Sequence, residues 1–600
     1  MGRTPARVCN RQGIALAQQG RFDEAVTSFQ QALQLRPDYF DAHNNLGNVL
    51  MFQGRLDEAV ASYQRALRLV PPGANDLLAS LYNHLGNVLR QQGKLSEAVA
   101  YGQRALDLQP NNAKAHNNLG NALQEQGRLD EAEACYRRAL VLEPNFAEAY
   151  YNRAIVARDQ RNFAEAVACC RRALEIRPDY AEAHNILGLA LQDQGRIADA
   201  MACYRRSIEL KPDCADAHNS MGNATREQGR LDDAVVWIRR ALELKPDLAE
   251  AHNALGLAWQ DRGRIADALA CYQRAIELKP QFAEAHLNRA LLWLLKGDFE
   301  QGLAEYEWRW RTRLKPLVRC PYQRPYWDGG PLEGKTLLIH AEQGLGDTIQ
   351  FIRYAAVARQ RGARVMLGCP KPLSRILRSC RFLDRLVEEI TPALDFDVYC
   401  PLMSLPGVLK TRLQSVPADV PYLFASPELV QKWRERLGSL EGFKIGIGWQ
   451  GSPTYVGDRW RSIPLRSFAP LAEMAGVRLV SLQKTAGREQ LAEVGDRFPV
   501  ADFAEEMDEA AGPFMDTAAM MTQLDLVITS DTAIAHLAGA LGVAVWVALP
   551  LVPDWRWLLD RSDSPWYPTM RLFRQQELGD WTGVFDRIRD ALERREGFGS

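Results

Sequence analysis

Three loops in the second half of the chain combine glycine with residue types that bind phosphate or accept protons. They are Gly344–Asp347, Gly448–Ser452 followed by Arg459 and Arg461, and Thr529–Gly542. A carboxylate can accept a proton, and arginines can neutralise phosphate. A helix that begins after a strand adds free backbone N–H groups, which also bind anions. These loops therefore predict a site for a phosphorylated ligand with a general base beside it.

Asp347 is the candidate general base. It follows a buried-strand pattern at residues 337–341 and lies where a helix begins, which is where α/β proteins hold ligands. We expect its carboxylate to point into a cleft, and the alternative is that it only caps the helix. The neighbouring Gly344 and Gly346 are assigned to the same ligand site.

The segment Thr529–Gly542 is the strongest of the three candidates. A strand ends at Thr529 and a helix begins near Thr532, so unpaired N–H groups and the helix dipole form an anion site there. Thr532 and His536 are four residues apart and share a helix face, where a diphosphate could contact both. The alternative is that Asp531 caps the helix and His536 packs in the core. The small residues around them allow a backbone to approach closely, which favours ligand binding.

The third loop follows a strand pattern at residues 444–449. It combines a glycine-rich turn with clustered arginines, which fits the neutralisation of phosphate. The residues of this region that we assign to the ligand site are Trp449, Gly451 and Arg461, together with Gln483 after the next strand.

Together, the three loops resemble the glycosyltransferases of the lipopolysaccharide heptosyltransferase type, which have the GT-B fold. The resemblance covers residues 336–575, and the Asp-Thr…His-Leu-Ala…Ala-Leu-Gly pattern is its most specific part. It implies that Asp347 is the base and that Arg461 contacts phosphate. It also implies that the nucleotide is held by Asp531, Thr532 and His536. Ala533 stands where the family usually has glycine.

Strands and helices alternate in two groups along the second half of the chain. The strand patterns lie at residues 337–341, 364–367, 444–449, 478–482, 526–529 and 543–548. Two such groups predict two Rossmann-like halves, at residues 336–435 and 436–600, with a cleft between them. The base would come from the first half, and the donor would bind to the second.

The first half of the chain is an array of repeats. Glycines recur every 34 residues, apart from an insertion before Gly93, and a proline follows each unit. They are Gly20, Gly54, Gly93, Gly127, Gly195, Gly229, Gly263 and Gly297, with Arg161 at the one missing position. This pattern of helix, turn and helix resembles the tetratricopeptide repeat. It predicts nine units in an all-α superhelix at residues 1–302, followed by an aromatic and proline-rich connector at residues 303–335.

A row of asparagines recurs in the first helices of the units. Its members are Asn44, Asn83, Asn117, Asn185, Asn219 and Asn253. Carboxamides donate and accept hydrogen bonds, so we expect this row to bind an extended peptide in the groove. The alternative is that the amides only join neighbouring helices. The array is similar to that of protein O-GlcNAc transferases, whose asparagine row falls mainly at the following position.

Composition excludes several other classes. The 73 basic and 74 acidic residues give a net charge of −1, without the surplus of a dedicated nucleic-acid binder. The longest apolar run, at residues 537–552, is too short and too interrupted to span a membrane. The N-terminus has no apolar signal segment, which predicts a cytoplasmic protein. The recurring histidines are expected to be structural, and neither a metal nor a cofactor is expected.

The sequence as a whole predicts a metal-independent, inverting glycosyltransferase. A nucleotide-sugar donor would bind to the second half, and Asp347 would take the proton of a protein acceptor recruited by the repeat groove. The architecture resembles bacterial repeat-plus-glycosyltransferase proteins, some of which modify flagellin. Two alternatives remain: a non-catalytic scaffold with a vestigial glycosyltransferase region, and a transferase that acts on a glycan or lipid.

Overall fold

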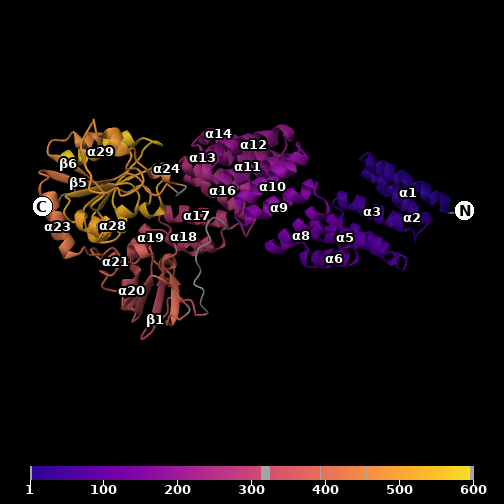
Figure 1. The fold of residues 1–600 in the computed structure, drawn as a ribbon, viewed down its shortest axis with the longest axis horizontal. Coiled ribbons are helices and arrows are strands. Elements are labelled where there is room, and N and C mark those ends of the chain that lie inside the picture. The colour runs from indigo at the N-terminus through magenta and orange to yellow at the C-terminus, as the bar shows by residue number, and fades with distance from the viewer. Residues whose placement is uncertain (1–2, 313–323, 392, 454–456, 595–600) are drawn as a thin grey trace. The chain divides into compact units, whose positions relative to one another are not determined.

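The computed structural model describes residues 3–312, 324–391, 393–453 and 457–594 (Figure 1). They belong to two compact units, Met1–Pro246 and Asp247–Ser600. The first unit consists of helices that pack in consecutive pairs. These are α1 (Arg3–Gln18), α2 (Phe22–Leu35), α3 (Phe40–Phe52), α4 (Leu56–Arg68), α5 (Asn75–Gln91), α6 (Leu95–Leu108), α7 (Ala113–Glu125), α8 (Leu129–Leu142), α9 (Ala147–Asp159), α10 (Phe163–Ile176), α11 (Ala181–Asp193), α12 (Ile197–Leu210), α13 (Ala215–Glu227) and α14 (Leu231–Leu244).

The second unit begins with two further pairs of the same kind. They are α15 (Ala249–Asp261) with α16 (Ile265–Leu278), and α17 (Ala283–Leu295) with α18 (Phe299–Tyr306). The nine pairs within residues 3–306 confirm the predicted all-α repeat array. The domain boundaries drawn from the sequence stay predictions.

The turn inside each pair has the left-handed backbone that the glycine series predicts. The eight glycines have φ between 73° and 83°. Arg161, which replaces the missing glycine, adopts the same conformation with φ of 62°. Glycine reaches this region without steric cost, whereas arginine does not.

The recurring histidines brace the turn between consecutive units. Five of them place Nε2 2.9 to 3.1 Å from the carbonyl oxygen of the proline six residues earlier. They are His43, His116, His184, His218 and His286. The hydrogen bond satisfies a carbonyl near the helix end that the proline follows. The prediction that these histidines are structural is thereby confirmed.

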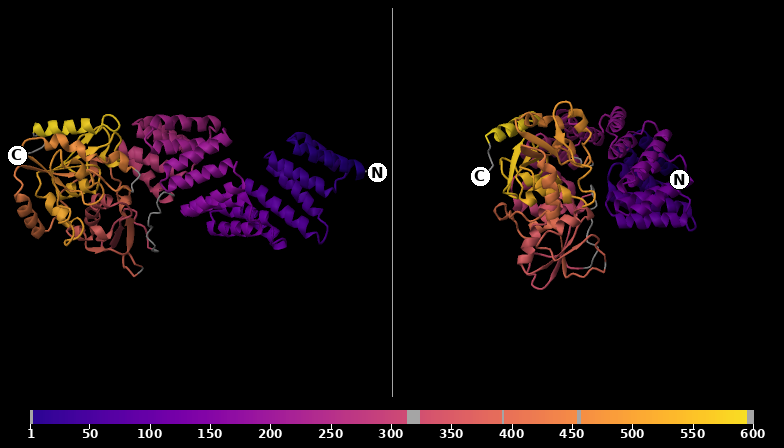
Figure 2. Two further views of the ribbon diagram at one scale, coloured as in Figure 1. Left: turned by 45° about the horizontal axis from the view of Figure 1, so that its top comes forward. Right: turned by 60° about the vertical axis from the view of Figure 1, so that its left-hand side comes forward.

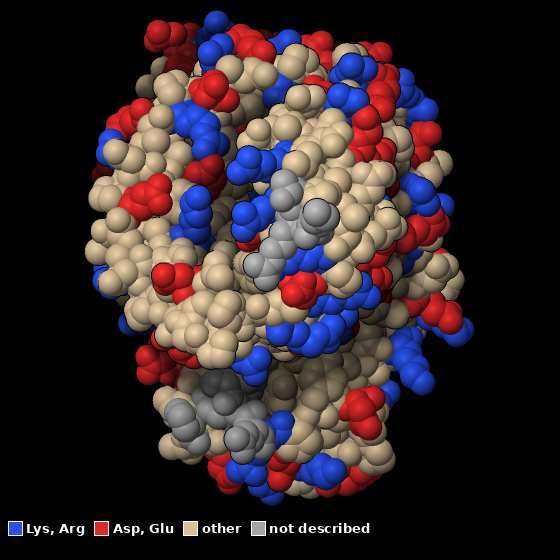
Figure 3. Space-filling view, turned by 90° about the vertical axis from the view of Figure 1, so that its right-hand side faces the viewer, with Lys and Arg blue, Asp and Glu red and all other residues tan. Residues whose placement is uncertain are grey.

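Charged residues on the repeats pair locally. Arg55 and Glu58 are 2.7 Å apart, Arg128 and Glu131 are also 2.7 Å apart, and both pairs span one turn of a helix. Figure 3 shows basic and acidic side chains interspersed over the face that it presents.

The connector after α18 begins with the 3₁₀ helix η1 (Glu307–Arg311). Trp308 in η1 stacks on His286 of α17, with ring centroids 3.8 Å apart, and Trp327 is buried. Pro316, Pro321 and Tyr322 of the predicted connector lie outside the described residues.

The first sheet of the α/β region is parallel throughout, in the order β3-β2-β1-β4. Its strands are β1 (Thr336–His340), β2 (Arg364–Gly368), β3 (Arg385–Val387) and β4 (Val398–Pro401). Its helices are α19 (Leu345–Phe351), α20 (Tyr354–Gln360), α21 (Ser374–Leu377) and α22 (Leu405–Val408), and α23 (Pro427–Gly438) leads to the second sheet.

The second sheet is also parallel, in the order β10-β9-β8-β5-β6-β7. Its strands are β5 (Phe443–Gly448), β6 (Val477–Ser481), β7 (Val500–Ala501), β8 (Leu526–Thr529), β9 (Val545–Leu549) and β10 (Met570–Arg574). Its helices are α24 (Asp458–Arg461), α25 (Ala469–Ala472), α26 (Gln490–Val494), α27 (Met515–Met521), α28 (Ala533–Leu541) and α29 (Trp581–Glu593), with the 3₁₀ helix η6 (Trp555–Trp557) after β9 (Figure 2).

The two sheets confirm the predicted pair of Rossmann-like halves. Each winds outward in both directions from a central strand, and in the second sheet the direction reverses between β5 and β8. Ligands of such sheets bind at the carboxyl ends of the strands where the direction reverses. Here those ends are Gly448 and Thr529, which begin two of the three loops predicted to form the site.

Candidate functional site

The loop between β1 and α19 holds Asp347 by both carboxylate oxygens. Oδ2 accepts a hydrogen bond from the Gly344 N–H at 2.8 Å, which caps the start of α19. Oδ1 accepts a hydrogen bond from the Arg556 guanidinium. The Asp347 side chain keeps 22% of its accessible surface. Oδ2 therefore caps the helix. Oδ1 pairs with the Arg556 guanidinium, and the carboxylate stays partly accessible to solvent.

Arg556 is a member of this cluster that sequence reasoning missed. It lies in η6, its side chain is only 7% exposed, and it also donates to Asp554 at 2.6 Å. Burial disfavours its charge, yet Asp554 and then Asp347 raise the pKa of Arg556 above the usual arginine value. One guanidinium thus joins a carboxylate of the first Rossmann-like half to a carboxylate of the second.

The turn between β8 and α28 combines a helix start with a positive side chain. Thr532 is the N-cap residue of α28, and its Oγ1 lies 3.4 Å from Thr529 Oγ1. Arg461 Nη1 donates to the Asp531 carbonyl oxygen at 2.8 Å, and its Nε donates to Asp458 at 3.1 Å. A guanidinium is therefore held against a helix N-terminus, and both groups favour a bound anion.

Two neighbours of Arg461 shape this turn. A methyl group on Gly451 would overlap the Arg461 guanidinium and lie 2.8 Å from Asp458 Oδ1, so glycine leaves the space that the arginine occupies. Burial, and next the Asp554 carboxylate, raise the pKa of Asp531 to about 6. Gly451, Arg461 and Asp531 are thus brought together as the sequence predicts.

His536 lies in the same helix but is enclosed. Its Nδ1 is 3.2 Å from Tyr567 Oη, and its ring stacks on Trp557 at 5.3 Å between centroids. Burial, and then Arg556, lower the pKa of His536 well below its usual value. The structure therefore places an uncharged His536 in the packing behind the helix start, with 4% of its surface exposed.

Trp449 and Gln483 brace the loop after β5. Trp449 is fully buried in the core of the second sheet, and its Nε1 donates to the Gly487 carbonyl oxygen at 3.0 Å. Gln483 accepts from the backbone N–H groups of Trp449 and Gln450 and donates to the carbonyl oxygens of Gln450 and Ala486. Both side chains hold the loop in place, and neither lies in the cluster of Asp347, Arg556 and Arg461.

Helices α19 and α28 approach each other at Gly346. A methyl group on Gly346 would lie 2.9 Å from His536 Cδ2 and 3.4 Å from the Ala533 Cα. Glycine is therefore what lets the first turn of α19, which carries Asp347, reach the start of α28.

Gly346→Ala is expected to reduce the free energy of unfolding by about 1–3 kcal/mol, because the added methyl group overpacks this contact. Urea unfolding followed by tryptophan fluorescence measures the change. Gly438→Ala is the matched control, since a methyl group there meets no atom within 4 Å and α23 gains a better helix former. An unchanged unfolding midpoint for Gly346→Ala would show that α19 and α28 can accommodate the methyl group, which would contradict the prediction.

The last repeat also reaches this cluster. The Tyr306 hydroxyl at the end of α18 accepts a hydrogen bond from Gln343 Nε2 at 2.8 Å, and burial raises the pKa of Tyr306 to about 12. Arg309 donates to Glu342 at 3.2 Å, and both side chains are almost fully buried. Burial raises the pKa of Glu342 to about 7, although Arg309 opposes this shift. The loop before Asp347 is thus anchored to the repeats.

The asparagine row links consecutive units in part of the array. The Oδ1 atoms of Asn83, Asn117 and Asn253 accept from Asn118, Asn152 and Asn288 at 2.9 to 3.0 Å, and Asn44 Oδ1 lies 3.2 Å from His84 Nδ1. For Asn185 and Asn219, the buried Oδ1 atom has no hydrogen-bond partner among the described residues. Ser220 stands where a partner asparagine for Asn185 would be.

Asn117→Ala is expected to destabilise the array by about 1–3 kcal/mol, because the buried amide of Asn152 loses its acceptor. Asn185→Ala is expected to change the free energy of unfolding by less than about 0.5 kcal/mol, because no hydrogen bond to its oxygen is lost. The two side chains are matched in burial, at 6% and 7% exposed. Thermal unfolding of both variants measures the two changes. Equal losses of stability would contradict the prediction that Asn117 contributes a hydrogen bond that Asn185 lacks.

Within the described ranges, no group of three or more His, Cys, Asp and Glu side chains is arranged to hold a metal ion. The helices in these ranges include none with the length and apolar character that crossing a membrane requires.

Comparison with known families identifies the repeats. Models of the tetratricopeptide repeat match residues 38–111, 117–181 and 187–249, and a TPR-repeat model matches residues 13–54 and 260–297. The N-terminal half of the chain therefore consists of tetratricopeptide repeats, as the 34-residue period predicts.

A curated relative and several solved structures are similar to this chain. Protein FlbA of Caulobacter vibrioides (strain ATCC 19089 / CIP 103742 / CB 15) is 26% identical over 312 residues, which cover 49% of this chain and 52% of FlbA. The chain thus spans about half the length of this curated relative.

Among solved structures, a tetratricopeptide repeat protein from Parabacteroides merdae ATCC 43184 is 18% identical with a TM-score of 0.37 and covers 42% of this chain and 98% of its own. The APC/C hetero-tetramer Cut9-Hcn1 is 17% identical with a TM-score of 0.39, and the match covers 47% of this chain and 54% of the chain in that structure. With scores this low, we draw nothing about function from these two structures.

Proposed function

We propose that this chain is a glycosyltransferase that moves a sugar from a nucleotide-sugar donor to a protein hydroxyl group, with inversion and without a metal ion. The observation that carries the proposal is the ion pair between Asp347 and Arg556 beside the start of α28. It places a carboxylate of one Rossmann-like half and the guanidinium of the other at the carboxyl ends of their sheets. A base and a positive group for a leaving diphosphate are the two parts that such a transfer needs.

In the proposed mechanism, the donor diphosphate lies at the N-terminus of α28 beside Arg461. Its negative charge gives Arg556 a partner besides Asp554 and Asp347, so that the guanidinium can turn from Asp347 towards the phosphate. Asp347 Oδ1 then accepts the proton of the acceptor hydroxyl as that oxygen attacks the anomeric carbon. The bond between the anomeric carbon and the phosphate oxygen breaks, and the two arginines stabilise the diphosphate that leaves.

The acceptor that we propose is a protein, such as flagellin or another surface protein, recruited by the repeats. Tetratricopeptide repeats are typical of protein–protein interaction, and tethering the acceptor raises its concentration near the base. Where an asparagine oxygen is bonded to the next unit, as in Asn83 and Asn117, the amide N–H groups would hold the peptide. A cytoplasmic location is part of the same proposal.

Isothermal titration calorimetry against a panel of nucleotide sugars tests the donor assignment. We expect one class of donor to bind to the wild-type protein, and Arg461→Ala and Thr532→Ala to weaken that binding at least ten-fold. If the wild type binds no nucleotide and no nucleotide sugar, the glycosyltransferase proposal is wrong.

The scaffold alternative is supported by one observation, that Trp449, Gln483 and His536 are used in packing. It predicts a protein partner but no bound nucleotide, so the same calorimetry separates it from the proposal. A glycan or lipid acceptor predicts normal donor binding and a transfer rate that array variants such as Asn83→Ala leave unchanged.

A further inference from the structure

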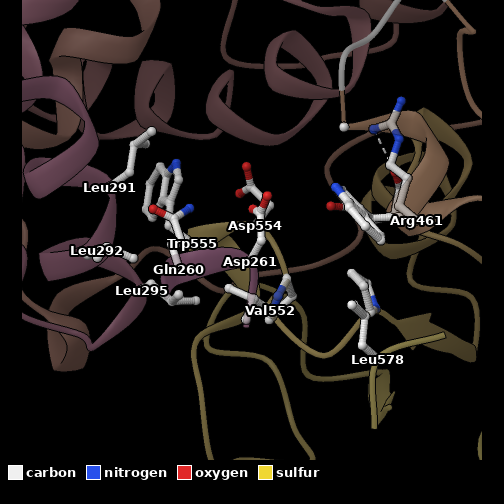
Figure 4. Close-up of a pocket in the computed structure, with 15 residues that line it drawn as sticks. Gln260, Asp261, Leu291, Leu292, Leu295, Arg461, Val552, Asp554, Trp555 and Leu578 are labelled. Atoms are coloured by element: carbon white, nitrogen blue, oxygen red, sulfur yellow. Dashed lines mark hydrogen bonds between the residues drawn. The ribbon is translucent and has the colours of Figure 1, made fainter. Parts of the chain in front are cut away.

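A cavity of about 210 Å³ lies between the last repeats and the carboxyl ends of β8 and β9 (Figure 4). Helices α15 and α17 form one wall of this cavity, and the other wall includes α24 and the loops after β8 and β9. The repeat wall carries Gln260, Asp261, Leu291, Leu292 and Leu295. The opposite wall includes Trp460, Arg461, Asp531, Val552, Asp554 and Trp555.

We propose that this cavity holds the sugar of the nucleotide donor, and that α15 and α17 select an uncharged sugar. The proposal rests on the function proposed above and adds a subsite and a substrate class to it. Indole and aliphatic faces can cover the apolar faces of a sugar ring, and carboxylates and amides can bind its hydroxyl groups. A cavity that combines apolar side chains with directed polar groups is also the usual form of a small-molecule site.

The position of the cavity fits the sugar better than the rest of the donor. Arg461 and Asp531 line it and also form the turn at the start of α28, where the diphosphate is placed. On its other side, Asp554 lines the cavity and pairs with Arg556, which in turn contacts Asp347. A ring bound here would therefore lie between the leaving diphosphate and the base, as attack on the anomeric carbon requires.

The charges of the lining select against an acidic sugar. Asp261, Asp531 and Asp554 supply carboxylates, and Arg461 supplies the guanidinium, which is already held against the α28 turn. A carboxylate on the sugar would meet like charges in a confined space and lose affinity for this reason. A neutral hexose or deoxyhexose carries no such charge, and its hydroxyl groups can donate hydrogen bonds to these carboxylates.

The Gln260 side chain, on the repeat wall of the cavity, is held in place by a hydrogen bond. Its Oε1 accepts a hydrogen bond from the Tyr272 hydroxyl of α16 at 2.8 Å, which sets the orientation of the amide at the end of α15. Leu291 is only half-buried, unlike Leu292 and Leu295, so its side chain can be changed with the least damage to the core. Leu291 is therefore the position from which to test the cavity.

The experiment measures two dissociation constants by calorimetry for the full-length protein and its variants. The probes are UDP-, GDP- and dTDP-linked neutral hexoses and deoxyhexoses, each with its bare nucleoside diphosphate, and UDP-glucuronate, which differs from UDP-glucose only by its carboxylate. Leu291→Trp narrows the cavity, and we expect it to change the ratio of sugar-nucleotide to bare-nucleotide affinity at least ten-fold without changing the affinity for the bare nucleotide. Leu287→Trp alters a half-buried leucine one turn earlier, outside the cavity lining, and should leave the ratio as in the wild type.

The outcomes separate the subsite from the proposed function. If the wild type binds bare nucleotide but Leu291→Trp leaves the ratio unchanged, the sugar does not lie in this cavity, while the proposed function stands. If Leu291→Trp loses both affinities, Leu291→Ala decides: a changed ratio with normal nucleotide affinity supports the subsite, and an unchanged ratio overturns it. Binding of UDP-glucuronate at least as tight as that of the best neutral donor would overturn the selection of an uncharged sugar.

Discussion

Asp347→Asn is expected to lower the rate of sugar transfer by about 10²–10⁴-fold, the usual contribution of a general base. The amide can still accept the Gly344 N–H bond that caps α19, so the loop should keep its conformation. It cannot take up the acceptor proton, so the loss falls on the chemical step. Nucleotide-sugar affinity should change by less than about three-fold, because the diphosphate is held by Arg461 and the α28 turn.

Asp502→Asn is the matched control for this prediction. The Asp502 side chain is 23% exposed, one of its oxygens pairs with Arg488 at 2.7 Å, and the other accepts from the Ala504 N–H at 3.2 Å. It thus repeats the environment of Asp347 away from the cluster around Arg556, and its replacement should leave transfer unchanged. The initial rate of sugar incorporation into the acceptor is the measurement. Transfer at the wild-type rate by Asp347→Asn would remove Asp347 from the role of base.

Periodic features of this chain could be predicted from the sequence because they depend on local chemistry. The glycine turns follow from backbone sterics, and the strand patterns at residues 337–341 and 526–529 follow from runs of apolar residues that became β1 and β8. Four strands were missed, β3, β4, β7 and β10. Of these, β3 and β7 have only three and two residues, which carry no pattern. The meeting of Gly346 with the start of α28 could not be read from spacing, because it depends on how two sheets pack.

In the candidate site, too, some residues could be predicted from the sequence and others depend on how the chain packs. Asp347 and Arg461 were predictable because each follows a strand and a glycine-containing turn. Thr532 was predictable because it lies where a helix begins directly after a strand. Arg556 was not, since an arginine between two tryptophans in a 3₁₀ helix has no motif. It acquires its role from Asp347, a carboxylate that is distant in the sequence, as well as from the neighbouring Asp554. The asparagine row depends on the neighbouring unit: Asn117 has Asn152 opposite it, whereas Asn185 does not, and only the packing of adjacent helices reveals this.

Arg556→Ala is expected to have the largest effect on stability of any single change in the site. Its guanidinium is the common partner of Asp347 and Asp554, and its removal leaves two partly buried carboxylates near each other without this positive charge. Breaking a buried ion pair from one side costs about 3–5 kcal/mol, because the remaining charge stays desolvated. Transfer should also fall by about 10²–10³-fold, since the leaving diphosphate loses a preorganised donor.

Urea unfolding of three variants separates the electrostatic cause from simple loss of packing. Arg556→Ala combined with Asp554→Asn should recover part of the lost stability, because one of the two uncompensated charges is gone, and a double-mutant cycle measures that coupling. Arg436→Ala removes an arginine that pairs with Glu506 at 2.7 Å on the surface, where both side chains are more than 40% exposed. It should leave the unfolding midpoint almost unchanged, because exposed ion pairs contribute little to stability. If Arg556→Ala unfolds at the same urea concentration as Arg436→Ala, the guanidinium does not hold the two Rossmann-like halves together, and its place in the mechanism loses its structural basis.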